Sequence, residues 1–230
     1  MDNILIVVPA RGGSKGIKLK NLKTILNESL IKITSKVIHK LPFKYTAIVS
    51  TDYDEIANEA KECKLEVPFL RPKHISGDLV SDWDVLNHAL IEMEKLKKKK
   101  FDIVIMLQPT SPLRIVDDII ECLNEFKRNN LDSVWTVSPV DLKFHPKKIL
   151  NAKNNRLSFY DNDGKNIIAR QQLEKCFIRN GLCYVISRDC ILHHKNIYGD
   201  NFGYCITKRD IVNIDSLRDL ERATVLMSEK

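Results

Sequence analysis

The sequence predicts an α/β fold with a mainly parallel sheet and helices on both faces. One reason is that short apolar runs alternate along the chain with stretches whose apolar residues recur at helical spacing. A second is that polar residues follow several of the apolar runs, as they do at the carboxyl ends of parallel strands. With 230 residues, 43% of them hydrophobic, the chain is large enough for one domain with a substantial core.

The elements follow in order from these patterns. A first strand is expected at residues 4–9, which begin with five apolar side chains, and a helix at 29–40, where Leu30, Ile33 and Val37 repeat at helical spacing. Short apolar runs predict further strands at 46–50, 66–70, 102–107, 133–137, 182–187 and 211–214, and helical spacing predicts helices at 54–64, 81–97, 116–128 and 217–228. Strands alternating with helices are typical of a parallel sheet.

The alternation stops between about residues 140 and 180. Pro146 and the polar runs Asn151–Asn155 and Asp161–Gly164 are typical of hairpins and turns. The apolar strand at 182–187 then returns the chain to the core. We therefore expect a single domain over residues 1–230, with a small protruding arm at about 140–180 that serves dimerisation.

The charge pattern disfavours a nucleic-acid-binding protein, and the cysteine spacing disfavours a metal site. The formal net charge is +7, and the run Lys97–Lys100 is best interpreted as the solvated end of a helix because no aromatic residues are interleaved with it. We expect no nucleic-acid partner. The six cysteines form no C-x-x-C pair, so we expect reduced core thiols. No signal peptide or membrane-spanning run is recognised, and we expect a cytoplasmic protein without a membrane partner.

The first strand leads into a loop suited to polyphosphate. Gly12 and Gly13 let backbone N–H groups approach phosphate oxygens, and Arg11, Lys15 and Lys20 add positive charge. The spacing matches neither the P-loop nor the dinucleotide-binding glycine pattern. A simple turn is the alternative interpretation of the two glycines.

Polar residues follow three more strands, at Ser50–Asp52, Gln108–Arg114 and Asn213–Ser216. Ligands bind at this edge of open α/β sheets, so the four segments are expected to converge. Asp215 is a candidate Mg²⁺ ligand if it faces the first loop, since Mg²⁺ prefers oxygen ligands and bridges phosphates. The plainer alternatives are a rigid proline turn at 108–112 and helix capping by Asp215 and Ser216, the latter favoured for Ser216.

These motifs together resemble the CMP-sialic acid synthetases, the acylneuraminate cytidylyltransferases, whose relatives act on legionaminic and pseudaminic acids. The matching segments are Ala10–Gly16, Lys20-Asn21, Ser50–Asp52, Leu107–Arg114, Arg170-Gln171 and Ile214-Asp215. They occur in order over nearly the whole chain.

The resemblance implies a Rossmann-like domain with a dimerisation arm, a homodimer, and transfer of CMP from CTP to a nine-carbon 2-keto sugar acid with Mg²⁺ as cofactor. It implies that Arg11 and Lys20, assisted by Lys15, bind the triphosphate and that Asp215 holds Mg²⁺. The nucleotide-binding set it implies is Ala10, Arg11, Gly12, Gly13, Lys15, Lys20, Asn21 and Ser81, and the set for the sugar acid is Gln108, Arg170, Gln171, Arg179 and Asn180. Arg11, Lys20 and Asp215 would be the catalytic residues. No general base is identified.

One motif departs from the family pattern. The family usually has Asp-Ile-Asp before the last helix, where this chain has Asn213-Ile214-Asp215, so Asn213 is a doubtful metal ligand and the number of metal ions stays open. The alternatives are a cytidylyltransferase for the eight-carbon acid KDO, disfavoured by Gln108-Pro109, a sugar-1-phosphate nucleotidyltransferase, and a non-catalytic nucleotide-binding protein. The sequence leaves the sugar acid open between legionaminic and sialic types.

Overall fold

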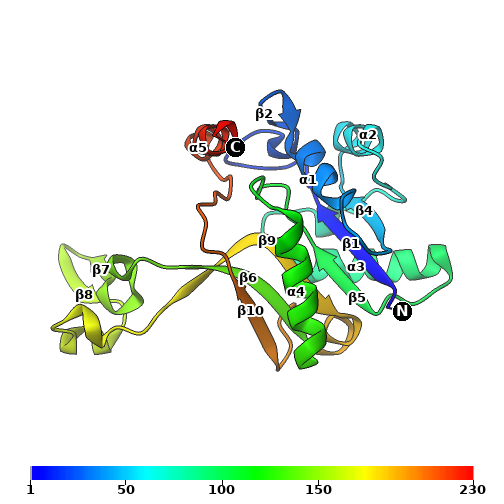
Figure 1. The fold of residues 1–230 in the computed structure, drawn as a ribbon. Helices are drawn as coiled ribbons and strands as arrows, with labels where there is room; N and C mark the ends of the chain where they lie inside the picture. Colours follow the sequence, from blue (N-terminus) through cyan, green and yellow to red (C-terminus); the bar gives the residue numbers. More distant parts are fainter. Residues whose placement is uncertain (1, 230) are drawn as a thin grey trace.

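A six-stranded sheet forms the centre of the computed structural model, which describes residues 2–229 (Figure 1). The strand order is β10-β6-β9-β5-β1-β4, and β9 alone of these six strands runs antiparallel to its neighbours. The strands are β1 (Ile4–Pro9), β4 (Thr46–Ser50), β5 (Ile103–Met106), β6 (Ser133–Pro139), β9 (Phe177–Ser187) and β10 (Phe202–Ile206). The predicted mainly parallel sheet is confirmed.

Helices cover both faces because successive side chains of a strand point to opposite sides. Ile6 and Val8 of β1 pack with apolar residues of α1 (Leu30–Ile38), α2 (Asp54–Glu62) and α4 (Val116–Asn129). Leu5 and Val7 pack on the other face with residues of α3 (Asp82–Lys97). A third cluster holds α5 (Leu217–Ser228) against the small hairpin of β2 (Thr24–Ile25) and β3 (Glu28–Ser29).

The strands differ from the prediction in three places: two predicted strands do not form, and one strand was not predicted. The run at 66–70 makes only two isolated bridges, by Glu66 and Leu70, because Pro68 between them has no N–H group to continue a ladder. The run at 211–214 is irregular, and its apolar residues Val212 and Ile214 pack in the α5 cluster instead. β10, which was not predicted, pairs with the edge of β6 and leaves alternate side chains exposed.

The predicted arm projects from the body of the protein between β6 and β9 (Figure 1). Its hairpin joins β7 (Leu150–Lys153) to β8 (Arg156–Phe159) through Asn154 and Asn155, whose positive φ angles of 52° and 58° suit a two-residue hairpin turn. Short helical turns at 142–144, 146–148, 162–166 and 170–172 make up most of the rest. β9 begins at Phe177, so the chain returns to the sheet slightly before the predicted limit.

Two further predictions concern the surface and the thiols. α3 ends at Lys97, and Lys97–Lys100 are exposed, as expected for the end of a solvated helix. All six cysteines are free, and three of them are buried. Over residues 2–229, no helix has both the length and the apolar character that crossing a bilayer demands.

Candidate active site

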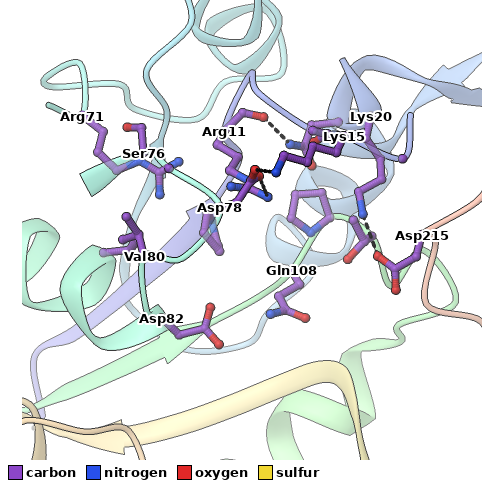
Figure 2. A pocket seen from close by; sticks show the side chains of 18 of the residues that line it. Arg11, Lys15, Lys20, Arg71, Ser76, Asp78, Val80, Asp82, Gln108 and Asp215 are labelled. Atoms are coloured by element: carbon purple, nitrogen blue, oxygen red, sulfur yellow. Dashed lines mark hydrogen bonds and ion pairs between the residues drawn. The ribbon is translucent and has the colours of Figure 1, made fainter. Parts of the chain in front are cut away.

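A cavity of about 660 Å³ opens beyond the carboxyl ends of β1 and β5 (Figure 2). Ligand-binding pockets commonly have a volume of this size. Its charged lining comes from widely separated parts of the chain: Arg11, Lys15, Lys20, Arg71, Asp78, Asp82, Arg179 and Asp215. Basic side chains outnumber acidic ones in this set, which makes the cavity suitable for an anionic ligand. The first, third and fourth polar segments converge as predicted, the third through Gln108–Thr110, whereas no residue of the second segment, Ser50–Asp52, lines the cavity.

The loop after β1 is shaped by close backbone contacts. A side chain at Gly12 would come within 2.7 Å of the ring of Tyr53, and one at Gly16 would come within 2.5 Å of the carbonyl oxygen of Asp215. The N–H of Gly12 donates to Asp52 Oδ1 at 2.9 Å. Buried Asn21 donates from Nδ2 to the carbonyl oxygen of Arg11 at 3.0 Å. These contacts hold the loop in one shape, with its basic side chains at the cavity.

Two of the loop cations contact one carboxylate. Arg11 Nη2 lies 2.8 Å from Asp78 Oδ1, and Lys15 Nζ lies 2.7 Å from Asp78 Oδ2. The hydrogen bond from Lys15, reinforced by its charge and by Arg11, lowers the pKa of Asp78 from its ordinary value. The Asp78 carboxylate therefore lies between these two cations.

The third loop cation contacts the predicted metal ligand. Lys20 Nζ lies 2.8 Å from Asp215 Oδ1, and Asn213 lines the same cavity. The segment is held by Asp219, whose Oδ2 accepts hydrogen bonds from the N–H groups of Asp215 and Ser216. Ser216 Oγ accepts from the N–H of Asp219 and caps α5, which confirms the capping alternative for Ser216.

A magnesium ion fits this donor set only if the substrate supplies further ligands. Within residues 2–229, no cluster of three or more His, Cys, Asp or Glu side chains is placed to hold a metal ion. Asp215 offers one charged oxygen and Asn213 one neutral carbonyl oxygen. Mg²⁺ commonly binds through one or two carboxylates together with substrate phosphates and water, so these two residues suit an ion that arrives with a nucleotide.

Arg71 is a cavity residue that the sequence analysis missed. It is buried, and neither its Nε nor its Nη2 has a hydrogen-bond partner in residues 2–229. Desolvation lowers its pKa from the ordinary value. Figure 2 shows it near Ser76 and Val80 on the side of the cavity away from Lys20. The available signal was its position directly after the apolar run at 66–70, the same criterion that marked the other segments.

The segment after β5 is fixed by a buried arginine. Arg114 donates to the carbonyl oxygens of Leu182, Gln108 and Gly181, the last two at 2.6 Å and 3.1 Å. Burial lowers the pKa of Arg114 to about 10. These bonds tie the end of β5 to β9 and place Gln108 in the cavity lining.

Several predicted contacts lie outside the cavity. Ser81 is not part of its lining: Ser81 Oγ accepts from the N–H of Asp84 and caps α3, while Val80 and Asp82 on either side face the cavity. Arg170 and Gln171 lie exposed on the arm. Asn180 is buried and donates to Ser138 Oγ at 3.1 Å.

The remaining predicted residues divide into two groups. The cavity is lined by Arg11, Lys15, Lys20, Asn21, Gln108, Arg179, Asn213 and Asp215, whereas Ala10, Gly12 and Gly13 are not in its lining. Gly12 acts through loop shape, and Ala10, which is buried, donates its N–H to the carbonyl oxygen of Ser50.

Open α/β sheets bind ligands beyond the carboxyl ends of their strands, and a net-positive cavity at that position suits an anionic ligand. The model of the cytidylyltransferase family matches residues 5–230, so the chain belongs to that family of nucleotidyltransferases.

Two relatives match the whole chain and 97% of their own length. The chain is 32% identical to a CMP-N,N'-diacetyllegionaminic acid synthase of Campylobacter jejuni and 31% identical to a post-translational flagellin modification protein B of Campylobacter coli. A solved CMP:2-keto-3-deoxy-manno-octonic acid synthetase complexed with CTP shares the fold, with a TM-score of 0.75 at 17% identity and 99% coverage of both chains.

Proposed function

We propose that this protein transfers CMP from CTP to the anomeric hydroxyl of a nine-carbon 2-keto sugar acid and releases pyrophosphate. The observation that carries the proposal is the junction of two distant segments in one cavity: Lys20 of the first loop lies 2.8 Å from Asp215, which precedes α5. Membership of the cytidylyltransferase family supports CTP as the nucleotide. A legionaminic-type acid is the first acceptor to test, because relatives at 32% and 30% identity carry that name.

In the proposed reaction the anomeric oxygen forms a bond to the α-phosphorus. The bond from that phosphorus to the oxygen bridging to the β-phosphorus breaks, pyrophosphate leaves, and the hydroxyl proton passes to solvent. Arg11, Lys15 and Lys20 hold the triphosphate and offset the negative charge that gathers on its oxygens. Arg71 supplies unpaired N–H donors for an acceptor group of the nucleotide. Mg²⁺ bound through Asp215, with Asn213 beside it, would neutralise further phosphate charge.

Triphosphate binding requires one rearrangement of the structure. Asp78 has to release Arg11 and Lys15, since both cations are bound to its carboxylate. Asp78 lies in the segment between Arg71 and α3, and its side chain is partly exposed, so it can turn to solvent without disturbing the core.

We also propose that the arm pairs with a second copy of this chain. Exposed apolar side chains are concentrated on it, among them Phe144, Leu157 and Ile168, which are 62%, 70% and 94% exposed. Apolar groups concentrated on one surface are typical of protein–protein interfaces. Such pairing would bring Arg170 and Gln171 to a neighbouring cavity. Light scattering of the full chain should give twice the monomer mass, and Leu157→Asp with Ile168→Asp should halve it.

The activity is tested by incubating the protein with CTP, Mg²⁺ and a panel of acceptors. The panel holds legionaminic, neuraminic and pseudaminic acids and KDO, and pyrophosphate release is the readout. We expect release with a nine-carbon acid and a CMP-sugar of the matching mass. Release with KDO alone would reassign the acceptor. CTP binding without release on the whole panel would make the protein a non-catalytic nucleotide binder and overturn the proposal.

A further inference from the structure

Asp82 differs from the other two carboxylates of the cavity. Asp78 is bound by two cations and Asp215 by one, each at hydrogen-bond distance. The charged neighbour of Asp82 is Arg179, whose Nη1 stays 3.7 Å from Asp82 Oδ2, beyond that distance. No hydrogen bond to the Asp82 carboxylate occurs within residues 2–229, although its side chain is only 31% exposed.

Helix capping does not account for Asp82. It is the first residue of α3, where an acidic side chain gains a little from the helix dipole. The capping box of α3 is already complete, with Ser81 and Asp84 bonding reciprocally. Desolvation raises the pKa of Asp82, and Arg179 offsets this only in part. Asp82 lines the cavity and the cap of α3 does not use its carboxylate, so that carboxylate is available to accept a hydrogen bond from a ligand.

Asp82 and Arg179 lie apart from the first loop, because Arg179 is carried by a different strand of the sheet. Arg179 lies in β9, whereas the loop with Arg11 follows β1, and β5 lies between these two strands. Gln108 follows β5. Figure 2 shows Asp82 on the side of the cavity away from Lys20 and Asp215, with Gln108 between Asp82 and Asp215. The cavity thus has a cationic end at β1 and a second end at β9 with a carboxylate and a guanidinium, and the Gln108 amide lies between the two ends.

The chemistry of the second end suits the acceptor. A carboxylate repels a triphosphate but accepts hydrogen bonds from hydroxyl and amide N–H groups, which are abundant on an acylated sugar acid. Arg179, held near Asp82, is an obvious partner for the carboxylate of the same molecule. We propose that Asp82 determines acceptor specificity by accepting a hydrogen bond from a hydroxyl or amide N–H group of the sugar acid, with Arg179 binding its carboxylate. This inference rests on the proposed function and adds a residue to its acceptor site.

The test compares Asp82→Asn and Asp82→Ala with the unaltered protein, varying CTP and the sugar acid separately. Glu92→Gln is the matched control, because it removes a charge from the same helix at a position outside the cavity lining. We expect Asp82→Ala to raise the acceptor KM about tenfold or more, Asp82→Asn to raise it less, and both to leave the CTP KM within about twofold. Arg179→Gln should raise the same acceptor KM.

Two results would overturn this inference. One is an unchanged acceptor KM in Asp82→Ala, and the other is a CTP KM that rises in step with it, which would assign Asp82 to the nucleotide. Calorimetric titration of the sugar acid into protein with CTP but no Mg²⁺ gives a readout without turnover. If the unaltered protein binds the acid yet releases no pyrophosphate, the proposed function fails, and weaker binding by Asp82→Ala still supports this assignment. If it binds no acid, both proposals fail.

Discussion

Lys20 Nζ lies 2.8 Å from Asp215 Oδ1, joining two residues that are 195 positions apart in the sequence. The Lys20 side chain is 16% exposed, while that of Asp215 is 77% exposed. The ammonium group is therefore fixed within the cavity and the carboxylate lies at its edge. The contact links the first loop to the segment before α5, and both ends of the chain contribute to one site.

Replacing Lys20 should reduce turnover strongly. We expect Lys20→Ala to lower kcat/KM for CTP by roughly 10²–10³, because a fixed cation aimed at developing phosphate charge is lost. Lys18→Ala is the matched control, since Lys18 is exposed in the same loop and is not in the cavity lining. Pyrophosphate release measures both. An equal loss in the two variants would mean that loop charge in general, rather than Lys20, matters.

Removing the Asp78 carboxylate should tighten CTP binding. Asp78→Asn frees Arg11 and Lys15 from the contacts that a triphosphate has to displace. We expect the Kd for CTP to fall about two- to tenfold at low salt, with the gain shrinking as salt screens these exposed charges. Titration calorimetry at two salt concentrations checks it. Weaker binding in the variant would show that Asp78 itself contacts the ligand.

A methyl group at Gly181 should destabilise the protein. Gly181 has a φ angle of +75°, and a Cβ there would lie 2.5 Å from Ser111 Oγ and 2.7 Å from Gln108 Oε1. We expect Gly181→Ala to lower the free energy of unfolding by about 1–3 kcal/mol through backbone strain and crowding. Gly13→Ala, where no atom lies within 4 Å of the new Cβ, should change it by less than about 0.5 kcal/mol. Urea unfolding of the two variants and the unaltered protein measures both changes, and equal losses in the two variants would contradict the prediction.

Replacing the buried Arg114 side chain should lower the free energy of unfolding more than Gly181→Ala does. Arg114→Met leaves the carbonyl oxygens of Leu182, Gln108 and Gly181 without their donor. We expect a loss of about 3 kcal/mol or more, since buried acceptors then lack partners. Arg128→Met, which removes an exposed surface pair with Glu125, should cost less than about 1 kcal/mol. If the two variants lost similar amounts of unfolding free energy, the hydrogen bonds of Arg114 would stabilise the fold no more than the surface pair does.

Asp82 should lower stability at neutral pH. Burial raises its pKa in the folded protein, so the fold favours the protonated form, and stability falls as pH rises from the ordinary value through the raised one. Asp82→Asn should therefore unfold at a higher urea concentration than the unaltered protein at pH 7, and the difference should shrink towards pH 4. A variant less stable at pH 7 would mean that Arg179 more than compensates for burial.

Much of the fold was predictable because its signals are local. The apolar run Ile4–Val8 and the helical spacing of 116–128 each specify an element without reference to the rest of the chain. The failures depend on tertiary context. Val212 and Ile214 alternate like a strand, yet they pack against α5, and no local pattern separates the two cases. β10 was missed because an edge strand needs no buried run on both faces.

The site was predicted best where several residues form a motif. Arg11, Lys20 and Asp215 were recognised from loops after apolar runs, and all three line the cavity. Arg71 was missed although it directly follows the apolar run at 66–70, because a lone arginine before a proline belongs to no recognised motif. Ser81 was predicted to bind the nucleotide; its hydroxyl caps α3, and it lies outside the cavity lining.

The two ends of the cavity are attached to different parts of the fold, one to β9, which follows the arm, and the other to β1. β9 follows the arm; its first residues, up to Arg179 at the cavity, are exposed, and the strand is buried from Asn180 on. A movement of the arm would therefore displace Arg179 before the buried part of β9. The loop with Arg11 follows β1, which lies in the interior of the sheet and is separated from β9 by β5. Under the proposed function, a substitution in the arm would therefore reach the acceptor end of the cavity through β9 before it reached the nucleotide end.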